Sequence, residues 1–110
     1  MKTRTTLAAA LAIAVAAPLV AETADNNWAK LCAACHGKDG AGHTRAGKKL
    51  DVKDLTAAAN QKMFTDDDAF AALKKGLTAP DGAEKMKPFA DKLSDDEIKA
   101  LVTYVRALAK

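Results

Sequence analysis

The sequence contains few aromatic residues and no run of basic residues that would form a charged face. One tryptophan, one tyrosine and three phenylalanines are scattered over 110 residues. Proteins that bind single-stranded nucleic acid combine stacking aromatic rings with a basic groove that follows the phosphates. The composition therefore excludes a nucleic-acid partner.

Cysteine is equally scarce, because the chain has only two. That number excludes a small scaffold held by several disulfides. Internal repeats and low-complexity linkers are lacking after residue 21, so we expect residues 22–110 to form one domain. A chain of about 89 residues is near the size at which an apolar core alone gives marginal stability, and a bound cofactor would add to that core.

The one long apolar run lies at the N-terminus. Lys2 and Arg4 precede the apolar residues 7–20, and a small residue closes the run. This pattern is typical of a secretory signal peptide, so we expect residues 1–21 to be cleaved and the mature domain to be periplasmic, without stable membrane insertion. An uncleaved anchor is the alternative. Cleavage removes two basic residues and no acidic ones, which lowers the net charge from +3 to +1.

Two early segments carry helical signals. Trp28, Leu31 and Cys32 recur at helical spacing and predict a first helix over residues 25–34, which brings the cysteines to its end. A weaker signal, Asp-Leu-Thr followed by three alanines, predicts a short second helix over residues 54–59.

Two later helices have clear caps. Thr65 and three aspartates predict a helix over residues 66–75 that ends at Gly76, with Met63 or Phe64 packing back on it. A capping box at residues 94–97 starts the last helix, which should run close to residue 109. Its apolar residues recur with helical period: Ile98, Leu101, Val102, Val105 and Leu108. No alternating strand pattern separates these segments, so we expect an all-α fold.

The strongest chemical signal in the chain is Cys32-Ala33-Ala34-Cys35-His36. Covalent haem attachment needs two thiols that add to the vinyl groups of the porphyrin and a histidine that reaches the iron from one face. Cys32 and Cys35 would then be the thioether donors, and His36 would be the proximal ligand. The protein would hold one haem c and use it to pass single electrons.

Three other interpretations of this motif are weaker. A thioredoxin-like dithiol expects a βαβ surrounding, which the sequence lacks. A zinc site would need Cys32, Cys35, His36 and His43 to turn toward one metal, with no second pair of metal-ligand spacing in the chain. A structural disulfide across two residues would be strained and would close a very short loop.

The sixth iron ligand decides the function, because an open position allows gas binding or peroxide chemistry while a methionine closes it. Met86 is the first candidate, since it lies in the polar loop 78–92. No helical pattern of apolar residues there explains a methionine. Met63 is the second, although it suits a packing role beside a helix cap. His43 is only seven residues past His36, and we expect a solvated loop histidine.

Together these residues resemble the class I c-type cytochromes, the small monohaem electron carriers of bacterial periplasms and mitochondria. The resemblance covers nearly the whole mature chain and rests on the attachment motif near the mature N-terminus and on Met86 in its Met-Lys-Pro-Phe stretch. It implies a class I cytochrome c fold, with short helices and loops around one covalently attached haem, and iron bound by His36 and Met86. A class II cytochrome would carry its motif near the C-terminus.

The resemblance also implies how the pocket is built. Trp28 and Tyr104 fall where the family packs the first helix across the last, and Leu50 falls where a side chain lines the haem pocket. The family often has proline at the position of Lys48, and the carbonyl of that residue accepts a hydrogen bond from the proximal histidine. Lys48 keeps the carbonyl but loses the rigidity of the proline ring, so the orientation of His36 is less firmly set.

The implied function is that of a monomeric single-electron carrier between redox proteins such as a cytochrome complex, an oxidase or a dehydrogenase. Lys85 and Lys87 flank Met86, and Lys48 and Lys49 lie in the other loop near the haem, so a basic docking rim or simply solvated lysines would account for them. An enzyme is the less favoured alternative, because no distal acid–base group is apparent. A subunit held inside a larger oxidase or dehydrogenase would have the same haem site.

Overall fold

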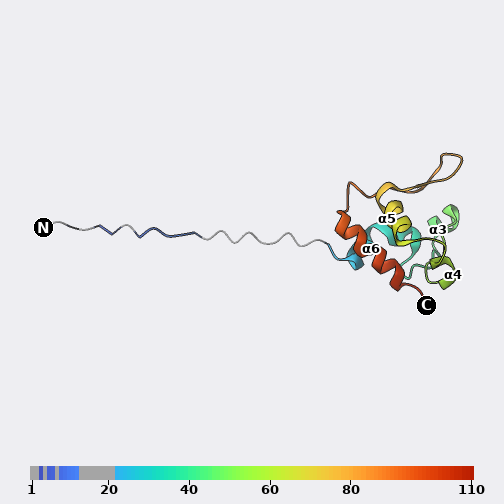
Figure 1. Cartoon of the computed structure of the whole chain (residues 1–110), viewed down its shortest axis with the longest axis horizontal. Helices are drawn as coiled ribbons and strands as arrows, with labels where there is room; N and C mark the ends of the chain where they lie inside the picture. The colour runs from blue at the N-terminus through green and yellow to red at the C-terminus, as the bar shows by residue number, and fades with distance from the viewer. Residues whose placement is uncertain (1–2, 4, 7, 13–21) are drawn as a thin grey trace.

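The structure, a computed structural model, describes residues 3, 5–6, 8–12 and 22–110 (Figure 1). Most of the expected signal peptide, residues 1–21, lies outside the described residues. Within them, no helix is both long enough and apolar enough to cross a membrane.

The N-terminal segment is one continuous run of helical turns. It consists of α1 (Ala24–Asn27), a π-helical turn η1 (Trp28–Cys32) and α2 (Ala33–His36). The Thr23 side chain accepts a hydrogen bond from the backbone N–H of Asn26 and caps α1. The expected helix over residues 25–34 is therefore confirmed, but the π-turn was not anticipated. A π-turn adds a residue to the turn, so the direction of the cysteine side chains does not follow from a 3.6-residue period.

Two short helices differ from the expectations. Helix α3 (Arg45–Leu50) lies in a glycine-rich stretch where no helix was expected. Helix α4 (Ala58–Gln61) begins four residues later than the predicted helix over residues 54–59, so that prediction is wrong. The carboxylate of Asp54 accepts hydrogen bonds from the backbone N–H and hydroxyl of Thr56, at 2.8 and 2.6 Å. This local turn competes with the helix and delays its start.

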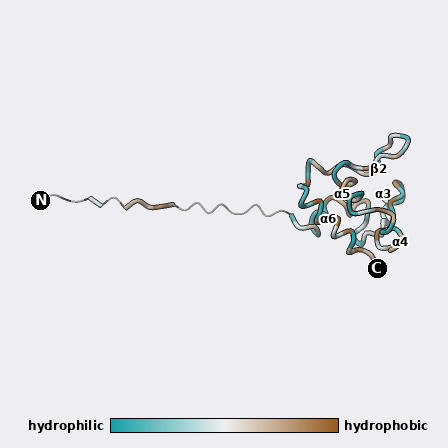
Figure 2. Tube along the Cα trace, in the orientation of Figure 1, coloured by the Kyte–Doolittle hydropathy of each residue, from teal (hydrophilic) through white to brown (hydrophobic). Residues whose placement is uncertain are grey.

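The two later helices agree with the sequence signals. Helix α5 (Asp66–Lys75) has a capping box formed by Thr65 and Asp68, and α6 (Asp95–Ala107) has one formed by Ser94 and Glu97. Both predictions are confirmed, and α6 ends two residues earlier than expected. Along α6, hydrophobic residues recur every three to four positions between hydrophilic ones, as an amphipathic helix requires (Figure 2).

A short antiparallel ribbon adds a little β-structure to this mostly helical fold. Strand β1 (Leu77–Thr78) pairs with β2 (Glu84–Met86), and Leu77 lies opposite Met86. The connection between the strands projects beyond the helices (Figure 1). The expected polar loop over residues 78–92 is therefore wrong in its first part, because strands of two and three residues are too short to show an alternating pattern.

The core lies where the N-terminal segment packs against α6. Ile98 and Leu101 of α6 are completely buried, and Trp28 is 3% exposed. The rings of Trp28 and Tyr104 are 5.2 Å apart, and the side-chain amide of Asn27 donates a hydrogen bond to Glu97. Helix α5 packs on α6 beside them. The first and last helices therefore cross, as the resemblance implies, and leave one side of the N-terminal segment facing a cavity.

Candidate functional site

A largely apolar cavity of about 770 Å³ opens between the N-terminal segment, α3, α5 and the ribbon. Its volume is typical of a cofactor site. Every segment around it contributes side chains, among them Cys32, Cys35, His36, Leu50, Leu55, Phe64, Leu73, Met86, Phe89 and Val105.

The two cysteines are free thiols on the wall of this cavity. Cys32 is buried and Cys35 is half-buried. Burial, with a smaller contribution from Cys35, raises the pKa of the Cys32 thiol to about 11. A thiol with such a pKa is protonated at neutral pH and is a poor nucleophile for disulfide exchange. The environment thus disfavours a thioredoxin-like dithiol.

A zinc site also finds no support. Over residues 22–110 and the few described before them, no group of three or more His, Cys, Asp or Glu side chains is arranged to hold a metal ion. His43 is exposed and does not line the cavity, as expected of a solvated loop histidine.

His36 reaches the same cavity with an unusual arrangement of its ring. Its Nδ1 atom is buried and has no hydrogen-bond partner. Burial lowers the pKa of the imidazole, which favours the neutral form, able to bind a metal through a ring nitrogen. The resemblance implied a bond from this ring to the carbonyl of Lys48, and that bond is absent because Nδ1 has no partner. The Lys48 carbonyl accepts from the backbone N–H of Asp51, at 3.4 Å.

Packing against Trp28 holds the histidine ring in place of that bond. The two rings are 5.5 Å apart. The Nε1 atom of Trp28 donates to the carbonyl oxygen of Gly37, the residue after His36, at 3.1 Å. The tryptophan is 3% exposed and therefore gives the histidine a rigid neighbour.

Helix α3, which the sequence analysis missed, supports the cysteine segment from the other side. The Thr44 hydroxyl donates to the carbonyl oxygen of Cys35 at 2.7 Å and also accepts from the N–H of Gly47, which caps α3. A Cβ atom at Gly47 would lie 2.6 Å from the same carbonyl oxygen of Cys35, so only glycine allows this approach. The approach brings Leu50 to the cavity wall, as the resemblance implies. Thr44 as a cap was the signal available in the sequence.

Of the three side chains considered for the sixth position, Met86 alone lines the cavity. It is half-buried and packs against the core. Gly76, with φ of 77°, lies so close to this strand that a Cβ atom there would be 2.5 Å from the carbonyl oxygen of Met86. The N–H of Phe89 donates to the carbonyl of Leu73 at 2.9 Å and fixes the chain after β2 on α5.

Met63 does not have the packing role expected of it. Its residue exposure is 71%, and it lies outside both the core and the cavity wall, so that expectation is wrong. Phe64 takes the role instead, because it packs against the core and lines the cavity.

The charged residues that line the cavity are mainly basic. Three acidic residues line it, Asp51, Asp68 and Glu84, against five exposed lysines, Lys30, Lys53, Lys85, Lys87 and Lys92. Lys48 and Lys49, for which the sequence left a docking rim and solvated lysines as alternatives, are exposed and do not line the cavity.

The fold and this cavity define a small c-type cytochrome with the class I fold. The chain belongs to the family described as cytochrome c oxidase, cbb3-type, subunit III, whose model matches residues 20–105. The solved KustC0563 c-type cytochrome is 30% identical, with a TM-score of 0.69 over 81% of this chain and 100% of that one. A point mutant of it matches at 30% identity and a TM-score of 0.66, over 79% of this chain and 99% of its own. Curated proteins gave no match.

As a c-type cytochrome, the protein carries covalently bound haem c with iron and takes part in haem-based electron transfer. The residues present fit this group. Two free thiols three positions apart and a half-buried imidazole face one largely apolar cavity, and that cavity lies against the buried core.

Proposed function

We propose that Cys32 and Cys35 form the thioether bonds to one haem, that His36 is the proximal ligand and that Met86 is the sixth ligand. The protein is then a monomeric periplasmic carrier of single electrons. The observation that carries this proposal is the position of Met86, which lines the same cavity as His36 but comes from β2, a segment 50 residues away in the sequence. A thioether sulfur suits an electron-transfer haem, because it closes the iron to other ligands.

The haem supplies reversible one-electron exchange at its iron, and the chain's own residues set the conditions for it. Leu50, Leu73 and Phe89 give the cavity apolar walls that exclude water. Such surroundings disfavour the more charged ferric form and raise the reduction potential. Trp28 keeps the His36 ring in place, and Gly76 keeps the Met86 strand against α5, so little has to reorganise between the two oxidation states.

The five exposed lysines of the cavity lining support docking with an acidic redox protein. A partner that docks over this cavity would meet them. A positive rim steers a negatively charged partner toward this cavity and raises the rate of encounter.

The family description favours a second candidate, an electron-transfer subunit held in a cbb3-type oxidase. The haem site would be the same in both cases. Purification of the tagged protein from its own membranes and periplasm separates them, because a free carrier is recovered alone and a subunit is recovered with oxidase polypeptides.

Absorption spectra of the exported protein, oxidised and reduced, test the proposed ligands. We expect c-type bands and, in the ferric form, the weak near-infrared band of methionine-to-iron charge transfer. Met86→Ala should abolish that band, whereas the matched variant Met63→Ala should keep it. A wild-type protein that lacks the band and is high-spin would contradict the carrier function and favour ligand binding or peroxide chemistry.

A further inference from the structure

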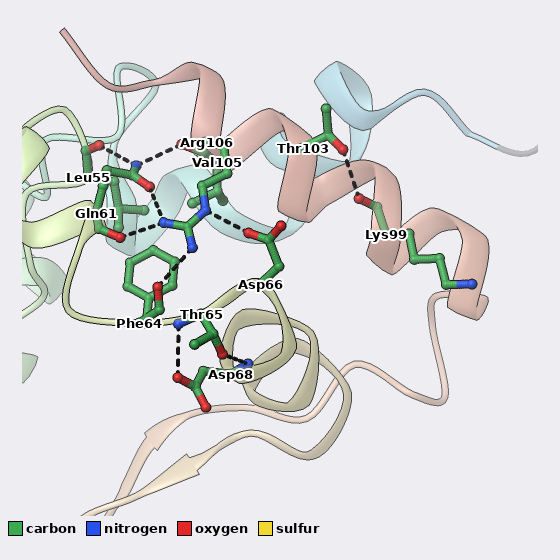
Figure 3. Close-up of polar contacts among 10 residues, drawn as sticks. All are labelled: Leu55, Gln61, Phe64, Thr65, Asp66, Asp68, Lys99, Thr103, Val105 and Arg106. Atoms are coloured by element: carbon green, nitrogen blue, oxygen red, sulfur yellow. Dashed lines mark hydrogen bonds and ion pairs between the residues drawn. The ribbon is translucent and has the colours of Figure 1, made fainter.

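A buried amide lies directly behind one wall of the cavity. Gln61, whose polar contacts are drawn in Figure 3, lies at the end of α4. It is 8% exposed. Its Nε2 atom donates to two backbone carbonyl oxygens, those of Leu55 at 2.7 Å and Val105 at 2.9 Å. A buried amide with both donors satisfied holds its neighbours in one arrangement. Here it joins a loop to helix α6.

Arg106 completes this group from the last turn of α6. Its Nη1 atom donates to the side-chain oxygen of Gln61 at 3.0 Å and to the backbone oxygen of Gln61 at 2.5 Å. Its Nη2 atom donates to the carbonyl oxygen of Phe64 at 2.8 Å, and its Nε atom pairs with the exposed carboxylate of Asp66 at 2.7 Å. The planar guanidinium thus contacts four acceptor groups from three residues at once, which a lysine ammonium cannot reproduce.

Each backbone segment that this group holds carries a side chain of the cavity wall. Leu55, Phe64 and Val105 all line the cavity. The guanidinium carbon of Arg106 also lies 4.4 Å from the centroid of the Phe64 ring. A positive charge is therefore held behind an aromatic ring that faces the haem cavity.

From this arrangement we propose that Arg106 is a positioning residue of the haem pocket, which acts through Phe64 and raises the reduction potential. Gln61 holds the guanidinium in place, and Asp66 offsets part of its charge. A fixed positive charge disfavours the ferric iron more than the ferrous iron, because the ferric form carries one more positive charge. The proposal rests on the proposed haem site and adds residues that do not touch the haem.

The pair Asp66→Asn and Asp95→Asn tests the proposal in the holoprotein. Both aspartates are exposed, both are the first residue of a helix and both form one ion pair, but only Asp66 pairs with Arg106, while Asp95 pairs with Lys74. We expect Asp66→Asn to shift the reduction equilibrium about threefold toward the ferrous form, which is about 30 mV for one electron. Asp95→Asn should leave the potential unchanged. Equal potentials in the two variants would overturn the proposal.

Two Arg106 variants separate charge from packing. Arg106→Gln should shift the reduction equilibrium about threefold toward the ferric form, because it removes the positive charge. Arg106→Lys keeps the charge, so it should keep most of the reduction potential while it lowers the melting temperature. A purely structural role predicts lower melting temperatures in both variants with no difference in potential, and that result would also overturn the proposal. If Arg106→Gln does not fold, the aspartate pair decides.

The ferric near-infrared spectrum, recorded for each variant, tests the proposed ligand Met86 separately from the role of Arg106. A wild-type spectrum without the methionine band refutes Met86 as ligand, yet the comparison of potentials between Asp66→Asn and Asp95→Asn still decides the role of Arg106.

Discussion

The N-terminal segment, residues 24–36, and the β1–β2 ribbon face the same cavity but are held in different ways. The first is a continuous run of helical turns whose cysteines and histidine lie within five residues. The ribbon has strands of two and three residues and depends on the close approach of Gly76 and on the hydrogen bond between Phe89 and Leu73. One side of the site is therefore local in sequence, and the other depends on tertiary contacts.

The largest expected effect comes from breaking the local side. Cys35→Ala removes one of the two proposed thioether bonds, and we expect haem content to fall and the remaining protein to unfold readily, because a domain of this size has little core without its cofactor. A pyridine haemochrome assay of the periplasmic fraction measures the haem content. Full haem content with normal two-thioether bands would contradict the proposed attachment.

Breaking the ribbon side should have a smaller and more specific effect. Gly76→Ala places a Cβ atom against the carbonyl oxygen of Met86 and strains a φ of 77°. We expect a loss of about 1–3 kcal/mol in the free energy of unfolding and a weaker methionine charge-transfer band, with haem still attached. Denaturant titration and the ferric spectrum measure the two effects.

Gly82→Ala is the matched control for this variant. Gly82 has a φ of 86°, so an alanine is strained there too, but no heavy atom lies within 4 Å of its added Cβ. A band weakened equally in both variants would mean that strain in the ribbon, and not the contact at Met86, disturbs the ligand.

The charged rim sharpens the comparison, because its lysines come from both regions. Lys85 and Lys87 flank Met86 on the ribbon side, whereas Lys30 lies on the N-terminal segment. We expect the electron-transfer rate with an acidic partner to fall several-fold as salt rises from low to physiological ionic strength. The double variant Lys85→Gln/Lys87→Gln should reduce this salt dependence more than Lys30→Gln. Stopped-flow rates that do not change with ionic strength would contradict the proposal that these lysines dock an acidic partner.

The smallest expected effect concerns how the N-terminal segment is tied to α6. Hydrogen bonds from the Ser94 backbone and then from the Asn27 side chain lower the pKa of Glu97. A lowered pKa in the folded state stabilises the protein above the ordinary glutamate range, and this contribution is lost as the pH falls through the lowered pKa. Glu97→Gln should therefore lose less stability than wild type between about pH 5 and pH 3.

Thermal melts across that pH range measure this effect, and Glu84→Gln is the control, since Glu84 is exposed on β2. Identical acid profiles for Glu97→Gln and wild type would show that the link between Glu97 and Asn27 contributes nothing to acid stability.

The elements that sequence reasoning located carry their signals within a few residues. The capping boxes at Thr65 and Ser94 placed both long helices, because a cap satisfies backbone groups of the turn that follows it. The errors arose where local signals compete. The side chain of Asp54 forms a turn with Thr56 where a helix was expected, and Met63 is exposed while Phe64 next to it packs inward.

The sequence by itself determined the attachment motif, the two capped helices and the mostly helical class, because each depends on neighbours in the chain. For the methionines, the sequence only ranked Met86 before Met63, and the tertiary structure decided that Met86 reaches the cavity. Tertiary structure alone decided how α3 supports Cys35 through Gly47 and how Arg106 comes to lie behind Phe64. These features join residues that are 12 to 50 positions apart. Such contacts depend on how the helices pack, and no local pattern encodes them.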